Sequence, residues 1–322
     1  MPKKKFIDPR WEGMGGIGTF SQQINRLNDY AAIVPDGHPA SPLDTLKSSK
    51  ALMGKKDLVV FFPGYIPPLV SNVPFVITIH DLNHLDRPEN SSKAKHIFYN
   101  TVIKRGCRQA EYVFTVSEFS RRRIIDWAGV SPDKVINVGN GVSEVFNPEG
   151  EPMDYDFKYL LCVSNRKLHK NEVGTLKAFR EAEIDKHIKL VFTGKPDEFI
   201  TSKIAELNLQ ERVVFTGYLP EEQLPKLYRT AMALIFVSFY EGFGLPIIEA
   251  MASGVPVITA DNTSLAEVAG GAALLTNAED TGQIADAITR VINDPELAKD
   301  LTQKGLLNAK RYSWQKTAVL VD

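Results

Sequence analysis

Residues 233–256 read ALIFVSFYEGFGLPIIEAMASGVP, and this stretch decides the fold class. The run Ala233–Val237 is apolar without polar alternation, as in a strand that is buried on both faces of a parallel sheet. A turn with Gly242 and Gly244 follows, and Pro246 stands where the first turn of a helix tolerates proline. The stretch therefore predicts a strand, a glycine-bearing turn and a helix.

The same unit recurs along the chain. Further short apolar runs predict strands at Lys5–Ile7, Leu58–Phe62, Phe75–Ile79, Tyr112–Val116, Val135–Val138, Tyr159–Val163, Lys189–Thr193, Val213–Phe215, Val257–Thr259 and Ala272–Leu275. Helical patterns fall between them, among others at Lys93–Gln109, Glu118–Ala128, Asn171–Ala182 and Glu221–Thr230. This alternation predicts an α/β protein with doubly wound parallel sheets. Because so many strands exceed a comfortable single open sheet, we expect two Rossmann-like domains.

The segment Phe146–Asp156 (FNPEGEPMDYD) is rich in proline, glycine and acids and lacks periodicity, so it reads as a linker. We expect a first domain over residues 1–145, a linker over 146–158 and a second domain over 159–322. Ligands of doubly wound sheets bind beyond the carboxyl ends of the strands, so the expected site is a cleft between the domains.

The composition is that of an ordinary globular protein, with 43% hydrophobic and 24% charged residues among 322. No apolar run reaches the roughly 20 residues that span a bilayer. Cys107 and Cys162 stand far apart in apolar or helical contexts, which favours buried free thiols and a reducing, cytoplasmic location. The nearly balanced net charge of −1 disfavours a nucleic-acid binder.

The charge is unevenly distributed along the chain. Residues 1–143 hold 19 Lys and Arg against 13 Asp and Glu, a net of +6, whereas residues 144–322 hold 19 against 26, a net of −7. An anionic partner of the first half and a chance distribution over solvated faces explain this equally well. One such partner is anionic lipid on the inner face of the cytoplasmic membrane. The cations considered for it are Lys104, Arg105, Arg108 and Arg121–Arg123, with Trp127 nearby.

Three further segments stand at predicted strand ends. Glu241 lies in the glycine-bearing turn and Glu249 one helical turn after it, so two carboxylates can accept hydrogen bonds from different parts of a polyhydroxyl ligand. Ser164–Asn171 (SNRKLHKN) concentrates cations at a strand-to-helix junction, which suits a diphosphate. The loop Gly13–Gly18 (GMGGIG) is a weak phosphate signal by itself. The structural alternative for Glu241 and Glu249 is a capped helix with surface acids, and that for Ser164–Asn171 is a solvated basic loop.

His80, with Asp81, ends the strand Phe75–Ile79, and a side chain at this place faces the ligand edge of a parallel sheet. A lone histidine is more often structural, and that alternative is also open here.

Taken together, the stretch from Glu241 to Glu249 resembles the Glu-x7-Glu signature of retaining glycosyltransferases of the GT-B fold. The resemblance is to the fourth glycosyltransferase family, which includes bacterial hexosyl- and mannosyltransferases of polysaccharide and lipopolysaccharide synthesis. The flanks Gly217-Tyr-Leu-Pro220 and Gly254-Val-Pro-Val257 match as well. The resemblance also implies a last helix, beginning at Trp314–Leu320, that crosses back to the first domain.

The resemblance assigns roles to the site residues. It places Glu249 on the ribose of the nucleotide and Lys170 on the departing diphosphate. Arg166 is the preferred partner of Lys170, and a similarity to family members that read GNLKPHKN makes Lys167 and His169 the alternative. The residues implied around the donor sugar and its phosphates are Gly15, Gly16, His80, Glu241, Gly242, Phe243, Gly244 and Leu245.

The implied function is retaining transfer of a hexose, with mannose favoured, from GDP-mannose or a UDP-hexose to a glycan or lipid-linked glycan acceptor. The implied route is a same-face substitution, and no cofactor or metal is expected because a cationic clamp replaces one. Asp154-Tyr-Asp156 matches a metal-binding Asp-x-Asp pattern but falls in the expected linker. The alternatives are a nucleotide-sugar 2-epimerase and an inactive sugar-nucleotide-binding subunit. The oligomeric state stays open.

Overall fold

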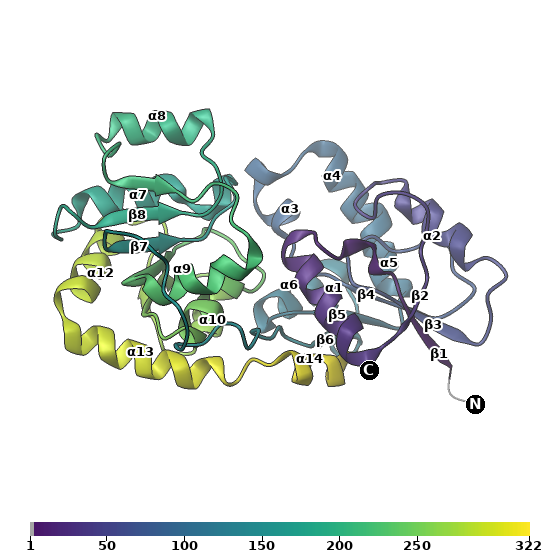
Figure 1. The fold of residues 1–322 in the computed structure, drawn as a ribbon. Coiled ribbons are helices and arrows are strands. Elements are labelled where there is room, and N and C mark those ends of the chain that lie inside the picture. Colours follow the sequence, from purple (N-terminus) through teal and green to yellow (C-terminus); the bar gives the residue numbers. More distant parts are fainter. Residues whose placement is uncertain (1–2) are drawn as a thin grey trace. The chain divides into compact units, whose positions relative to one another are not determined.

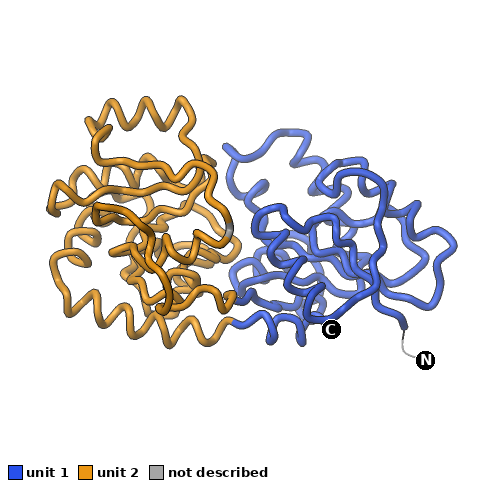
Figure 2. Tube along the Cα trace, viewed as in Figure 1, with its two compact units in different colours: residues 1–141, 313–322 blue, residues 142–312 orange. Residues whose placement is uncertain are grey.

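The computed structural model describes residues 3–322 and divides them into two compact units (Figure 2). Unit 1 comprises the described residues up to Gly141 together with Ser313–Asp322, and unit 2 comprises Val142–Tyr312. The division thus falls before the expected boundary at 145, and the expected linker 146–158 is part of unit 2. The reason is Arg229, whose guanidinium donates hydrogen bonds to the carbonyls of Asn147 and Glu151 and so fastens this segment.

Among the described residues, unit 1 contains a six-stranded sheet in the order β2-β1-β3-β4-β5-β6, and its paired strands are all parallel. The strands are β1 (Lys4–Ile7), β2 (Ala31–Ala32), β3 (Leu58–Phe62), β4 (Phe75–Thr78), β5 (Tyr112–Thr115) and β6 (Val135–Asn137). The helices are α1 (Gly15–Asn28), α2 (Asp44–Leu52), α3 (Asn83–Asp86), α4 (Lys93–Phe98), α5 (Lys104–Gln109), α6 (Glu118–Ala128) and α14 (Trp314–Val321). They are labelled in Figure 1.

Both faces of this sheet are buried. On one face, Val60 and Ile77 pack with Ile103 and Ile124 in a core formed with α2, α5 and α6. On the other face, Phe20 of α1 lies with its ring centroid 6.3 Å from those of both Phe61 and Trp314. The C-terminal helix α14 therefore completes the packing of unit 1.

Unit 2 repeats this architecture, with a described six-stranded parallel sheet in the order β12-β11-β10-β7-β8-β9. The strands are β7 (Tyr159–Cys162), β8 (Lys189–Phe192), β9 (Val213–Phe215), β10 (Ala233–Phe236), β11 (Val257–Ala260) and β12 (Leu274–Thr276). The helices are α7 (Glu172–Glu181), α8 (Glu198–Glu206), α9 (Leu224–Thr230), α10 (Leu245–Ala252), α11 (Leu265–Ala269), α12 (Thr281–Asn293) and α13 (Pro295–Ala309). Helices α7, α8 and α12 bury one face of the sheet, and α9, α10 and α11 contact the strands from the other.

The predicted α/β class with two Rossmann-like parallel sheets is confirmed. Two details differ. The two-residue edge strand β2 was missed, because two exposed alanines carry no strand signal. The helix expected over Lys93–Gln109 contains a π-helical turn at Tyr99–Ile103, which has both of its terminal side chains buried.

We predict that Trp314→Ala destabilises unit 1 by about 3–5 kcal/mol, because it removes a large buried side chain from the face shared with α1. Urea unfolding of the full chain measures this. The exposed neighbour Gln315→Ala is the control and should change the free energy of unfolding by less than about 0.5 kcal/mol. Equal effects of the two substitutions would contradict the packing role of α14.

Candidate active site

Two loops of unit 2 meet at one edge of its sheet. Strand β7 pairs in parallel with β10, so the loops that follow their carboxyl ends are neighbours. Asn171 holds them together, because its buried Nδ2 donates hydrogen bonds to the carbonyl of Val237 (3.1 Å) and to that of Ala278 (2.7 Å). The basic loop after β7 and the glycine-bearing loop after β10 therefore form one rigid edge.

Lys170 and Glu241 form an ion pair at this edge. Lys170 Nζ lies 2.6 Å from Glu241 Oε1, and the side chains are only 16% and 13% exposed. The ammonium also lies 5.1 Å from the centroid of the Phe236 ring. Two residues that are 71 positions apart in sequence are thus brought into contact, and their charges are partly withdrawn from water.

The loop between Glu241 and α10 is held by its backbone. Gly244, the N-cap of α10, has φ of +105°, a region that residues with a Cβ rarely adopt. The single hydroxyl proton of Ser264 is shared between the carbonyls of Glu241 and Phe243, which lie 2.9 and 3.0 Å from its Oγ. The Phe243 side chain packs against Tyr312 with ring centroids 5.6 Å apart, so this residue offers a ligand its backbone rather than its ring. Gly242 and Leu245 flank it in the same loop and the first turn of α10.

Glu249 lies in α10, one turn from the glycine loop, as predicted. The buried Tyr228 hydroxyl donates a hydrogen bond of 2.7 Å to its Oε2. Burial raises the pKa of the Glu249 carboxyl to about 7, and the Tyr228 hydrogen bond opposes this shift. The carboxyl group thus changes charge close to neutral pH.

Arg166 is locked against the sheet. Its backbone has φ of +61°, which is strained for a residue with a side chain. Its guanidinium lies about 5 Å from the ring centroids of Phe192 and Phe215, and Nη2 lies 3.1 Å from Glu172 Oε1. Nη2 also donates a 2.7 Å hydrogen bond to the Thr193 carbonyl. The buried Nε and Nη1 have no hydrogen-bond partner within residues 3–322.

The other two basic-loop residues differ in exposure. Lys167 is exposed. His169 is buried, and its carbonyl accepts a hydrogen bond of 2.8 Å from the Phe239 amide. The loop therefore brings Lys170 to Glu241, holds Arg166 in an aromatic setting and leaves Lys167 in solvent.

In unit 1, His80 follows β4, and its ring centroid lies 5.1 Å from that of Phe20 with the two rings nearly perpendicular. Its Nε2 lies 2.9 Å from the Pro63 carbonyl, which can only accept, so Nε2 is assigned as the protonated nitrogen. Desolvation lowers the pKa of His80 to about 4, which keeps the ring neutral at pH 7. Gly15 and Gly16 form the first turn of α1, and Gly15 has φ of +58°.

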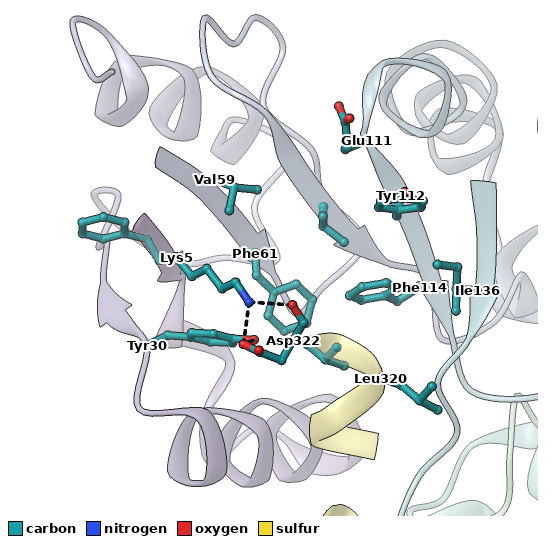
Figure 3. A pocket seen from close by; sticks show the side chains of 13 residues that line it. Lys5, Tyr30, Val59, Phe61, Glu111, Tyr112, Phe114, Ile136, Leu320 and Asp322 are labelled. Atoms are coloured by element: carbon teal, nitrogen blue, oxygen red, sulfur yellow. Dashed lines mark hydrogen bonds and ion pairs between the residues drawn. The ribbon is translucent and has the colours of Figure 1, made fainter. Parts of the chain in front are cut away.

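A cavity of about 270 Å³ in unit 1 is separate from all these residues. It lies against the strands of the sheet and the end of α14, with Phe61, Phe114 and Leu320 among its lining residues (Figure 3). Lys5 and Asp322 form an ion pair of 2.8 Å at its edge. None of the predicted site residues lines this cavity.

Sequence reasoning missed the residues that hold the site together. Asn171 ends the basic loop and begins the expected helix Asn171–Ala182, Ser264 lies outside every motif, and Tyr228 falls within the expected helix Glu221–Thr230. Each acts through a partner that is distant in sequence, and no local pattern marks such a contact. A polar residue in an otherwise apolar position was the one available signal for Tyr228.

Comparisons with known proteins identify the family of this chain. The profile described as glycosyl transferases group 1 matches residues 146–307, half of the chain, and the profile described as glycosyltransferase family 4 matches residues 32–145. Both describe transferases, which does not favour the epimerase alternative.

Relatives and solved structures were also found. O-antigen chain mannosyltransferase B of Escherichia coli is 29% identical over 82% of this chain and 73% of the relative. The serotype-specific mannosyltransferase WbdA of Escherichia coli is 24% identical over 90% of this chain. The matched region spans 40% of that longer relative. A crystal structure of Anabaena HepE in complex with UDP-glucose has a TM-score of 0.80 at 17% identity, covering 99% of each chain. This last likeness shows the GT-B fold.

We predict that Glu249 makes the stability of the ligand-free protein fall as pH rises. The native carboxyl keeps its proton up to about pH 7, whereas the unfolded one loses it near pH 4.5, so stability is lost between these values. Glu249→Gln should be more stable than the wild type at about pH 8, by on the order of 2 kcal/mol, and this difference should shrink toward about pH 5. Urea unfolding at both pH values measures it, and a difference independent of pH would refute the shifted pKa.

Proposed function

The chain belongs to the family of glycosyl transferases group 1, and on that premise we propose that it moves a mannosyl group from GDP-mannose to a glycan or lipid-linked glycan. The observation that carries the proposal is the Lys170–Glu241 ion pair at the strand ends of unit 2. A cation and a carboxylate in contact suit a ligand that carries phosphate and sugar hydroxyls next to each other.

The leaving group is proposed to bind the basic loop. Lys170 neutralises the diphosphate, and the two unsatisfied buried donors of Arg166 make it the preferred second cation. Exposed Lys167 and buried His169 remain the alternative pair. Glu249 receives the ribose hydroxyls as a hydrogen-bond acceptor, with Tyr228 orienting one of its oxygens. Gly242, Gly244 and Leu245 let the donor approach the backbone at the start of α10.

The proposed chemistry retains the anomeric configuration. The bond between the anomeric carbon and the phosphate oxygen breaks, and the acceptor oxygen bonds to that carbon on the same face. The acceptor proton passes to the departing phosphate, so the nucleoside diphosphate leaves. A carboxylate nucleophile would be needed for a two-step route. Glu241 is poorly suited to that role because the Lys170 ammonium is in contact with its Oε1.

In unit 1, His80 is proposed to accept a hydrogen bond from a donor-sugar hydroxyl at Nδ1, since Nε2 is bound to the Pro63 carbonyl. Gly15 and Gly16 are proposed to let phosphate or acceptor approach the first turn of α1. The mannose assignment is supported by the mannosyltransferase relatives, and the nucleotide-sugar donor class by the UDP-glucose named in the HepE structure. UDP-hexoses are the second donor candidates.

The acceptor is proposed to be membrane-borne, which would place the enzyme at the inner face of the cytoplasmic membrane. Within residues 3–322, none of the helices combines the length and apolarity of a bilayer-spanning segment.

Lys170→Ala is predicted to lower kcat by about 10²–10³-fold with a smaller change in KM, because Lys170 acts on charge that develops in the transition state. Initial rates of nucleoside diphosphate release measure this. Exposed Lys177 on α7 provides the control, and Lys177→Ala should leave both constants unchanged. An unaltered kcat in Lys170→Ala would remove Lys170 from the mechanism.

Activity is predicted to survive a chelator, since lysine and arginine supply the charge that a metal supplies in other glycosyltransferases. Transfer assays before and after dialysis against EDTA test this. Loss of activity that added Mg²⁺ or Mn²⁺ restores would overturn the cationic clamp as the sole source of charge.

A further inference from the structure

Helix α2 of unit 1 has one anchored side and one apolar exposed side. On the anchored side, Asp44 accepts hydrogen bonds of 2.8 and 2.9 Å from Arg10, and Leu52 is buried in the core. On the other side, Leu43 is 61% and Leu46 53% exposed. Large apolar side chains are thus exposed to water on a helix whose inner side is already packed against unit 1.

Two neighbouring residues extend this apolar surface. Met53, directly after the helix, is 74% exposed, and at 3.6 residues per turn it follows Leu46 on the same side. Val70 is 63% exposed, and its amide donates a 3.0 Å hydrogen bond to Ser49 Oγ, which places it beside the helix. We call Leu43, Leu46, Met53 and Val70 the α2 patch.

Lysines accompany the α2 patch. Lys47 and Lys50 follow Leu43 at helical spacing, Lys50 exposed and Lys47 half-buried against Gly37, and the exposed Lys55 and Lys56 come just after Met53. Of the two acids between residues 43 and 57, Asp44 is buried and ion-paired with Arg10, which leaves Asp57 against four lysines. Apolar side chains among cations are typical of segments that lie in the interface of an anionic membrane.

The cations that the sequence first suggested for lipid are largely engaged within the protein. Arg108 and Arg121 donate hydrogen bonds to the carbonyls of Ala128 and Val135. Arg123 forms an ion pair with Asp86. Trp127 Nε1 donates a 3.0 Å hydrogen bond to Asn100. This earlier surface therefore offers lipid few uncommitted groups.

We propose that the α2 patch and its lysines dock the protein on an anionic lipid surface. The apolar side chains enter the boundary between headgroups and acyl chains, and the lysines contact headgroup phosphates. The inference rests on the proposed function, because docking on a membrane brings the enzyme to a membrane-borne acceptor. Figure 1 shows α2 at the periphery of unit 1.

The test is co-sedimentation of the full chain with phosphatidylcholine vesicles that contain phosphatidylglycerol, at low salt. Leu46→Glu/Met53→Glu should weaken binding by at least about tenfold, because it puts carboxylates where apolar groups enter the interface. Lys47→Gln/Lys50→Gln/Lys55→Gln should weaken it by about fivefold per cation, and salt should have the same effect on the wild type. The matched control is Leu307→Glu on α13 of unit 2, since Leu307 is 65% exposed and should be neutral.

Wild-type binding that Leu46→Glu/Met53→Glu leaves unchanged would overturn the proposal, and so would a wild type that does not bind at low salt. Loss of binding in Lys104→Gln/Arg105→Gln but not in the α2 variants would move the surface back to α5. Gel filtration that shows a dimer abolished by Leu46→Glu/Met53→Glu, without vesicle binding, would assign the patch to a second copy. GDP-mannose binding, followed by thermal shift, should be equal in the wild type and all these variants, so a failure of docking is distinguishable from a failure of the proposed function.

Discussion

The Lys170 ammonium and the Glu241 carboxylate lie 2.6 Å apart and are mostly withdrawn from water, and the geometry of the site in unit 2 follows from this contact. Neither charge is easily buried alone, so each loop is stable in this position only when the other loop supplies the partner. Asn171 fixes the distance, because its amide reaches the end of β10 from the loop after β7. The pair thereby converts two strand ends into one site for a ligand with adjacent phosphate and hydroxyl groups.

Much of this arrangement was predictable from the sequence because its signals are local. Continuous apolar runs located the strands, and the order Gly244, Leu245, Pro246 located the start of α10 within a residue. The position of Glu249 one turn into that helix followed directly. The family resemblance then identified which carboxylates and cations to consider.

The remainder depends on contacts that no local pattern contains. The family resemblance made Arg166 the preferred partner of Lys170, but only tertiary packing places its guanidinium on Phe192 and Phe215 and beside Glu172. The resemblance placed Phe243 near the donor sugar, and the packing of its ring on Tyr312 leaves its backbone for a ligand. The basic run at Arg121–Arg123 looked like a lipid surface, whereas most of its donors satisfy carbonyls and carboxylates of unit 1. Apart from Glu172, these partners are too distant in sequence for a local pattern to reveal them.

The measurement that tests the account most directly is a thermal-shift titration of the wild-type chain with GDP-mannose, UDP-glucose and free mannose. A ligand present at 100 times its Kd stabilises the native state by about 2.7 kcal/mol, which such a titration detects readily. The account predicts that GDP-mannose stabilises the chain and that UDP-glucose stabilises it less. Mannose alone should not stabilise it, because the basic loop binds the phosphates. If neither GDP-mannose nor UDP-glucose stabilised the chain, the assignment of the Lys170–Glu241 edge as the donor site would be contradicted.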